Sequence, residues 1–156
     1  MEHEIGLLGL QVLIASLCLT PLRRFAGVNL LKFRRALGLI GFFYIFLHLL
    51  VWMVLDVQIP SQMIADIYKR PYITIGMLGF VLMIPLAATS YNAAIRKLGR
   101  NWRQLHKLAY PAVLLGGVHF VMLRKGWQLE PLLYVAVIAG LLLIRVPVRR
   151  RLTRHA

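Results

Sequence analysis

The chain has 156 residues, 60% of them hydrophobic, and its 19 lysines and arginines against five acidic residues give a formal charge of +14. A soluble domain of this length rarely joins so high an apolar fraction to so strong a charge, whereas apolar spans alternating with basic loops beside a membrane explain both. We therefore exclude a nucleic-acid-binding protein, although the charge taken alone would suit one.

Apolar segments of about 20 residues, long enough to cross a bilayer, recur along the chain. We predict an all-α transmembrane bundle of about five spans, at residues 5–22, 36–55, 72–90, 105–123 and 129–147. The links between the spans are too short for a separate soluble domain, so we expect residues 1–156 to form a single transmembrane domain. The chain has no glycine-rich dinucleotide motif and no motif for covalent c-type haem, and its one cysteine, Cys18, excludes an intramolecular disulfide.

Basic residues are distributed unevenly over these links. The first link, the third link and the C-terminal tail each hold five lysines or arginines, whereas the second and fourth links hold two each. In chain order, the five groups are Arg23, Arg24, Lys32, Arg34 and Arg35; Lys69 and Arg70; Arg96, Lys97, Arg100, Arg103 and Lys107; Arg124 and Lys125; and Arg145, Arg149, Arg150, Arg151 and Arg154. Because basic loops stay on the cytoplasmic side, the first link, the third link and the C-terminus are predicted to be cytoplasmic and the N-terminus to be outside.

Two histidines lie inside predicted spans at nearly the same depth. At a rise of about 1.5 Å per residue, His48 and His119 each lie about 12 residues above the cytoplasmic start of their spans, in the outer half of the bilayer. His106 lies near the cytoplasmic face, roughly 20 Å below His119. An imidazole in hydrocarbon costs several kcal/mol unless its nitrogens find partners, so histidines within spans indicate function.

Neutral imidazole is an axial ligand of haem iron, and histidines on two helices could hold one b-type haem edge-on between the spans at 36–55 and 105–123. Such a haem needs small residues near its ligands to leave room for the flat macrocycle. Glycines also serve close helix packing. The glycines close to these histidines in the sequence are Gly38, Gly41, Gly116 and Gly117.

Other chemistries fit the spans less well. A zinc site needs a third ligand at the same depth, an ion transporter ordinarily has carboxylates inside the membrane, and a Ser–His–Asp hydrolase needs an acid beside its histidine. No aspartate or glutamate lies in the central part of any predicted span. The chain therefore shows no substrate-transforming site of its own, and we expect an electron-transfer subunit. Two alternatives stay open: a stand-alone cytochrome b-type ferric or quinone reductase, and a non-redox scaffold or transporter whose histidines hold helices together.

Six motifs follow one another along the chain: TPLRRFAG at 20–27, RRALGL at 34–39, YIFLH at 44–48, KRPYITIG at 69–76, PLAATS at 85–90 and LGRNWRQLHKLAYPAVLLGGVHF at 98–120. In this order and spacing they resemble the MsrQ (YedZ) family, the haem-binding membrane subunits of the bacterial protein-methionine-sulfoxide reductase system, within the ferric-reductase-like transmembrane group. The resemblance extends from about residue 3 to residue 145. Family members are expected to have a further span upstream of the point where this chain begins. A relative with six spans would then have its N-terminus in the cytoplasm. One additional span reverses the side, so this agrees with the prediction that the N-terminus of the present chain lies outside.

The resemblance implies a multi-pass protein of the bacterial inner membrane that carries electrons through one haem b, with a second haem as a further option. The electrons would come from the quinone pool or a cytosolic flavin reductase and pass to MsrP, a periplasmic molybdenum-containing catalytic subunit, for the repair of oxidised periplasmic proteins. FMN is a further cofactor that the resemblance implies.

The haem ligands carried over onto this chain are His48, His106 and His119. Because Arg35, and not a histidine, stands thirteen positions before His48, the sequence offers His106 no evident histidine partner for a second haem. Arg34 and Arg35 are candidates for pairing with haem propionates, since arginine suits carboxylates, and they are equally explained as topology signals.

Overall fold

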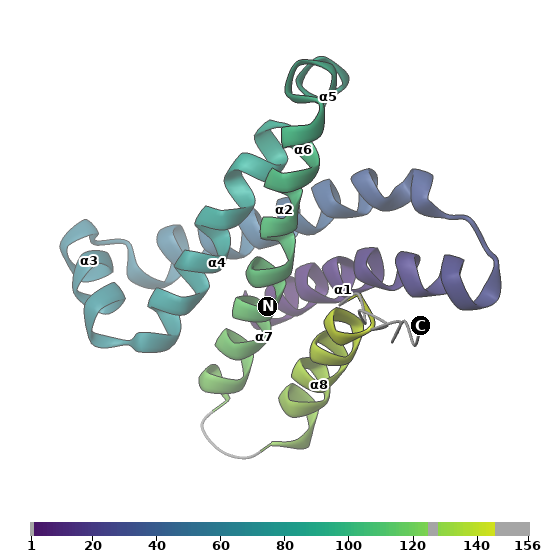
Figure 1. Cartoon of the computed structure of the whole chain (residues 1–156). Helices are drawn as coiled ribbons and strands as arrows, with labels where there is room; N and C mark the ends of the chain where they lie inside the picture. The colour runs from purple at the N-terminus through teal and green to yellow at the C-terminus, as the bar shows by residue number, and fades with distance from the viewer. Residues whose placement is uncertain (1, 125–127, 146–156) are drawn as a thin grey trace, which may run out of the picture.

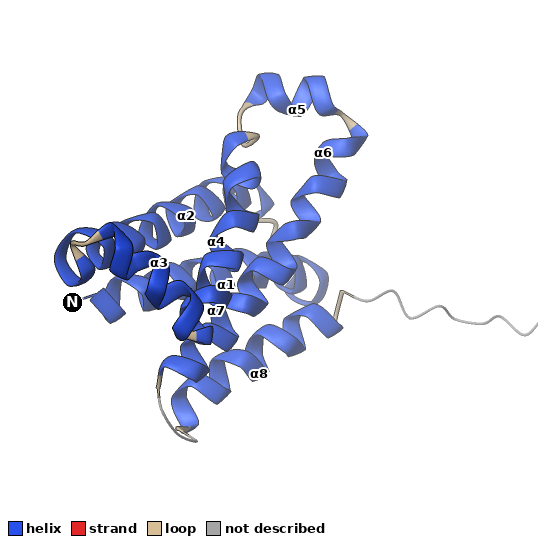
Figure 2. Ribbon diagram, turned by 90° about the vertical axis from the view of Figure 1, so that its left-hand side faces the viewer, coloured by secondary structure: helices blue, strands red, loops and turns tan. Residues whose placement is uncertain are grey.

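The computed structural model describes residues 2–124 and 128–145 (Figure 1 and Figure 2). Its longest helices are α1 (Glu2–Ala26), α2 (Arg34–Val51), α4 (Pro71–Ala88), α7 (Ala109–Leu123) and α8 (Leu129–Leu143). Between them lie the short 3-10 turns η1 (Leu31–Phe33) and η3 (His106–Leu108), the π-helical turn η2 (Trp52–Val57), and the short helices α3 (Pro60–Lys69), α5 (Asn92–Leu98) and α6 (Arg100–Leu105). Every element in the described ranges is helical, which confirms the predicted fold class.

Four helical stretches within the described residues are long and apolar enough to cross a membrane: His3–Ala26, Leu31–Leu55, Pro71–Ala88 and Arg100–Leu123. They coincide with the first four predicted spans to within a few residues at each end. The fifth predicted span corresponds to α8, which is apolar but shorter than the other four. Its last predicted residues, 146–147, lie outside the described residues. A bundle of about five spans therefore agrees with the sequence prediction.

The helices α3 and α5 occupy links for which the sequence analysis predicted no helix. Pro60 and Pro71 stand at the starts of α3 and α4, where the fixed φ of proline suits a helix and its missing N–H costs no hydrogen bond. Gly27 follows α1 with a φ of +70°, and Gly99 separates α5 from α6 with a φ of +49°. Glycine adopts this left-handed conformation without strain, so these two residues end the helices that precede them.

The helices α1 and α2 lie side by side as a hairpin (Figure 1). A Cβ atom added to Gly41 of α2 would lie 2.6 Å from the side chain of Leu13 in α1, so the two backbones come this close only because Gly41 has no side chain. Leu10, Leu13 and Leu17 of α1 are buried. Their spacing of three and four positions places them on one face of the helix, which therefore points into the bundle.

The helix α7 packs between α4 and α8. On one side, a Cβ atom added to Gly79 of α4 would lie 3.4 Å from the carbonyl oxygen of Ala112 in α7. On the other side, a Cβ atom on Gly117 of α7 would lie 2.9 Å from the side chain of Ile138 in α8, which is fully buried. The core therefore follows the lines along which α1, α4, α7 and α8 meet.

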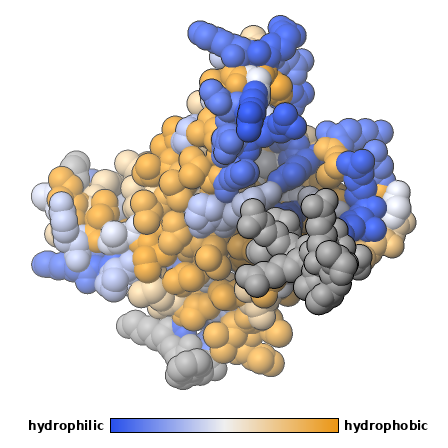
Figure 3. Space-filling model, in the orientation of Figure 1, coloured by the Kyte–Doolittle hydropathy of each residue, from blue (hydrophilic) through white to orange (hydrophobic). Residues whose placement is uncertain are grey.

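Figure 3 shows that hydropathy is segregated over the surface. Hydrophilic residues gather over α5, over α6 and near the connection between α1 and α2, and apolar residues cover the middle of the molecule. A smaller hydrophilic group lies at the left, by α3 and the start of α4. Exposed apolar side chains, among them Phe43, Leu78, Val81 and Leu133, lie on the outward faces of the helices, as expected for contact with lipid.

Candidate functional site

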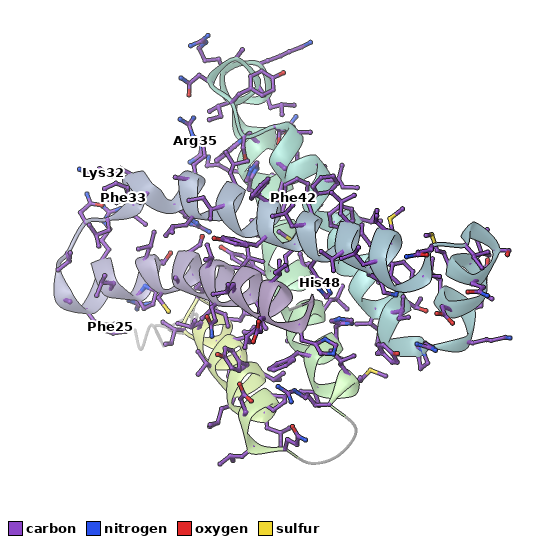
Figure 4. The ribbon with its side chains drawn as sticks, turned by 180° about the vertical axis from the view of Figure 1, so that it is seen from behind. Phe25, Lys32, Phe33, Arg35, Phe42 and His48 are labelled. Carbon is purple, nitrogen blue, oxygen red and sulfur yellow. The ribbon has the colours of Figure 1, made fainter. Side chains whose placement is uncertain are left out.

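His48 of α2 and His119 of α7 come together inside the bundle, although they are far apart in the sequence. Their ring centroids are 6.3 Å apart and the ring planes are inclined at 68°. Figure 4 shows Arg35, Phe42 and His48 following one another along α2, with His48 farthest from the connection to α1. The structure thus brings together the two histidines that the sequence places at one depth, each from a different span.

Each imidazole lies against a glycine of a neighbouring helix. A Cβ atom added to Gly6 of α1 would lie 3.1 Å from Nδ1 of His48, and one added to Gly76 of α4 would lie 2.8 Å from Nδ1 of His119. A Cβ atom cannot approach a ring atom as closely as it would at Gly76, so any other residue there would displace His119. Gly6 and Gly76 therefore provide the space in which the two rings stand.

A hydrogen bond fixes the orientation of the His119 ring. Its Nδ1 lies 2.7 Å from the carbonyl oxygen of Tyr72, at the start of α4. A carbonyl oxygen only accepts, so Nδ1 carries the hydrogen and donates it, which leaves the lone pair on Nε2. This arrangement is typical of metal-binding histidines, in which the second ring nitrogen is held by a protein oxygen.

Both histidines line a cavity of about 750 Å³ that α1, α2, α4 and α7 enclose and that extends to α3. This volume lies within the usual range for small-molecule and cofactor sites. We call it the outer cavity. Its inner walls are largely apolar, with Leu10, Phe80 and Phe120 among the lining residues, and toward α3 the lining residues are charged: Asp66, Lys69 and Arg70.

A second cavity, of about 430 Å³, lies at the other end of the bundle, and we call it the inner cavity. Its lining includes His106 and four basic residues, which are Arg34, Arg35, Arg103 and Lys107. His106 is the one histidine among the described residues that line it. The two cavities share a wall formed by Leu13, Met83, Ala112 and Val113, so they follow one another along the bundle.

His106 has neighbours quite different from those of the histidine pair. The ring of Trp102 stacks on it, with centroids 3.9 Å apart, and its Nδ1 lies 3.1 Å from the carbonyl oxygen of Trp102. Its Nε2 lies 3.4 Å from the hydroxyl oxygen of Ser90, which itself donates to the carbonyl oxygen of Leu86 at 2.6 Å. The structure therefore brings together one pair of histidines and places His106 apart from them.

Arg34 and Arg35 line the inner cavity and are absent from the described lining of the outer one. Nη1 of Arg35 donates to the side-chain oxygen of Asn92 at 2.6 Å, which ties α2 to α5. The charged residues that line the cavity of the histidine pair are instead Asp66, Lys69 and Arg70, and the sequence analysis counted the two basic ones only as topology signals.

The four glycines near the histidines in sequence have different surroundings, and among them only Gly116 lines the cavity of the histidine pair. Gly117 is two positions before His119, about 200° around the helix, so it faces α8 and not the cavity. Gly41 packs against Leu13, and Gly38 lines the inner cavity, whereas Gly116 does line the outer one. The space beside the rings comes from Gly6 and Gly76 on other helices, which spacing along one helix could not reveal.

The two histidines of the outer cavity suit a metal ion whose other ligands come from a cofactor and not from the protein. Among the described residues, no group of three or more histidine, cysteine, aspartate or glutamate side chains is placed to hold a bare metal ion. Two imidazoles from different helices would hold a haem, whose macrocycle supplies the remaining ligands of its iron. Their ring centroids are 6.3 Å apart, and both rings line a cavity of about 750 Å³ with largely apolar walls. The residues present therefore fit a haem.

Comparisons with known proteins point to the same chemistry. Residues 4–117 match the family model described as "Ferric reductase like transmembrane component". The chain is 50% identical over 146 residues to proteins of Brucella ovis and Brucella canis, each named "Protein-methionine-sulfoxide reductase heme-binding subunit MsrQ". The match covers 93% of this chain and 66% of each relative. No solved structure matches the chain.

Proposed function

Because the chain belongs to the family of ferric-reductase-like transmembrane components, we propose that it is a membrane electron carrier that holds a b-type haem between His48 and His119. The observation that carries this proposal is the pair of imidazoles, 6.3 Å apart and each standing over a glycine, in a cavity of about 750 Å³. A bound haem supplies the one-electron redox change at its iron, and the protein supplies ligands, orientation and a low dielectric.

The side chains around the pair explain how the protein holds the ligands in place. The carbonyl oxygen of Tyr72 accepts from Nδ1 of His119, which holds that ring in one orientation and leaves the lone pair on Nε2. Phe80 stacks on Phe42 at 5.7 Å and approaches Phe46 at 6.3 Å, so aromatic rings fill the contact between α2 and α4. These contacts keep the helices that bear and flank the ligands at a fixed separation.

We propose a direction of electron flow from the resemblance to MsrQ subunits, combined with the orientation that the basic links favour. The basic links lie beside the inner cavity, so we infer that this end faces the cytoplasm and that the histidine pair lies toward the periplasm. Electrons would enter on the inner side, from the quinone pool or a cytosolic flavin reductase, and leave from the outer cavity. The two cavities share a wall, which connects the two ends.

The acceptor is proposed from the relatives, which are named as haem-binding subunits of protein-methionine-sulfoxide reductase. We propose that this chain delivers electrons to an MsrP-like periplasmic catalytic subunit that reduces methionine sulfoxide in oxidised proteins. In this role the chain is an electron-transfer subunit of the inner membrane and transforms no substrate itself. FMN belongs to the same proposal.

The first experiment is a reduced-minus-oxidised absorption spectrum of the detergent-purified protein, with the haem quantified as its pyridine complex. We expect sharp b-type bands in the wild type and their loss in His48→Ala and in His119→Ala, because each change removes one axial ligand. A well-folded wild type that shows no such bands after reconstitution with haem would contradict the proposal and favour a non-redox scaffold.

His106→Ala in the same experiment determines the number of haems. If the inner cavity holds a second haem through His106, this variant loses part of the bound haem and keeps the bands of the outer site. If the protein holds one haem only, the variant keeps the full amount. Circular dichroism of each variant serves as the control for folding.

A further inference from the structure

In the segment KRPYITIG at 69–76, Tyr72 and Gly76 contact His119. The first two residues of the segment, Lys69 and Arg70, have as yet no role in the site. Gly76 provides the space for the ring of His119, and the carbonyl oxygen of Tyr72 accepts from Nδ1 of that ring. Lys69 and Arg70 stand at the beginning of the same segment, and both line the outer cavity. One short stretch of chain thus contributes to both the inside of the cavity and its charged end.

We propose that Lys69 and Arg70 bind the carboxylate groups of the ligand in the outer cavity, which for a b-type haem are its two propionates. This inference rests on the proposed haem site between His48 and His119. A haem is a flat apolar body with both carboxylates on one edge. The outer cavity likewise has an apolar part and a charged part. Its walls are largely apolar, and its charged lining residues lie at the end of α3 and just before α4.

Arg70 is held in a defined position and keeps hydrogen-bond donors to spare. Its Nη1 donates to the hydroxyl oxygen of Tyr72 at 3.3 Å, and its Nε lies 3.4 Å from Oδ1 of Asp66. A guanidinium has five N–H donors, so these two contacts leave donors for a carboxylate. Arginine is also the residue best suited to planar recognition of a carboxylate.

The balance of charge at this end of the cavity favours an anion. Asp66 is the one acidic residue among its described lining residues, and it pairs with Arg70. Lys69 makes no ion pair within the described residues, so Lys69 and Arg70 against Asp66 leave the described charged lining at this end with an excess of one positive charge. The inner cavity has more cations, but it does not contain the histidine pair. Arg34 and Arg35 stand thirteen or more residues before His48 on the same helix, about 20 Å along its axis, so Lys69 and Arg70 are the basic residues that share a cavity with the pair.

The experiment compares haem with haem dimethyl ester, which has the same macrocycle and iron but no free carboxylate. Haem-depleted protein in detergent is titrated with each compound, and the dissociation constants come from the Soret band. We expect the wild type to bind haem about tenfold more tightly than the ester, the effect of one additional charged hydrogen bond. In Lys69→Gln/Arg70→Gln this ratio should fall to about one, while the affinity for the ester stays unchanged.

Arg124→Gln is the matched control. Arg124 is a cation predicted to lie on the same side of the membrane, with a similarly exposed side chain, 44% against 53% for Arg70. It faces Glu130 at 3.9 Å and is absent from the described lining of the cavity, so its variant should keep the wild-type ratio. Arg70→Lys, which retains the charge, should keep most of the preference for haem.

The midpoint potential of the bound haem is a second measurement. It would not change if Lys69 and Arg70 had only a structural role. Removal of a positive charge beside the haem stabilises the ferric form, so Lys69→Gln/Arg70→Gln should have a more negative potential than both the wild type and Arg124→Gln. An unchanged preference for haem over its ester in the double variant overturns the inference and leaves the haem site intact. A wild type that binds neither compound overturns the proposed function and the inference with it.

Discussion

Gly76 has no side chain, and the ring of His119 occupies the space that a Cβ atom there would need. Four positions earlier, the carbonyl oxygen of Tyr72 accepts a hydrogen bond from Nδ1 of the same ring. Gly6 has the same relation to His48 from another helix. At the scale of single residues, the site therefore depends as much on two glycines as on its two histidines. Neither glycine carries a functional group, so their role is one of space alone.

Gly76→Ala tests this role directly. The added Cβ atom would lie 2.8 Å from Nδ1 of His119, so we expect the ring to be displaced, its hydrogen bond to Tyr72 to be lost and the affinity for haem to fall about tenfold or more. The measurement is a haem titration followed at the Soret band. Gly140→Ala in α8 is the control, because a Cβ atom there meets nothing within 4 Å and should leave binding unchanged. Equal affinities in the two variants would contradict the assigned role of Gly76.

At the scale of the elements, pairs of helices are defined by glycines that meet bulky side chains. Gly41 of α2 receives Leu13 of α1, and Gly117 of α7 receives Ile138 of α8. Without a hydrophobic driving force between helices in lipid, such close contacts are a main source of helix association in membranes. The hairpin of α1 and α2 matters for the site, because Gly6 and His48 face each other across it.

Gly41→Ala should destabilise this hairpin. The new Cβ atom would lie 2.6 Å from the side chain of Leu13, and overpacking of this kind typically costs about 1–3 kcal/mol. We expect a lower midpoint in thermal unfolding of the detergent-purified protein. Gly38→Ala, one turn earlier on the same helix, meets nothing within 4 Å and should unfold at or slightly above the wild-type temperature. A Gly41→Ala variant as stable as Gly38→Ala would show that the two helices can separate at no cost.

At the scale of the whole molecule, the hydrophilic surface divides into a large basic region and a smaller region at α3. The larger region includes α5 with Arg96 and Lys97, and Arg35 is tied to this helix through Asn92. The smaller region includes Lys69 and Arg70. Because basic residues are retained in the cytoplasm, this division predicts an orientation with α5 inside and α3 outside.

Labelling of introduced cysteines tests the orientation. In a background that carries Cys18→Ser, we expect Ser61→Cys in α3 to react with a membrane-impermeant maleimide in intact spheroplasts. Lys97→Cys in α5 should react only after the membrane is permeabilised. Both native residues are exposed, so access to the reagent depends on the side of the membrane and not on burial. The reverse pattern would invert the proposed direction of electron flow.

The sequence alone determined the all-helical class and the positions of the long apolar helices, because the length of an apolar run and its flanking charges are local properties. It also placed His48 and His119 at one depth, since the rise of a helix is constant. The helices α3 and α5 escaped prediction because Pro60, Gly99 and their neighbours define short local elements within polar links.

Only the tertiary structure decided which helices are neighbours. The meeting of His48 with His119, the place of Gly6 and Gly76 beside them and the approach of Lys69 and Arg70 all depend on contacts between different helices. The same contacts place Arg34 and Arg35 in the inner cavity with His106. Helical periodicity predicts on which face of its helix a residue lies. It does not predict which helix packs against that face, because helix pairing depends on how the side chains of both helices fit together.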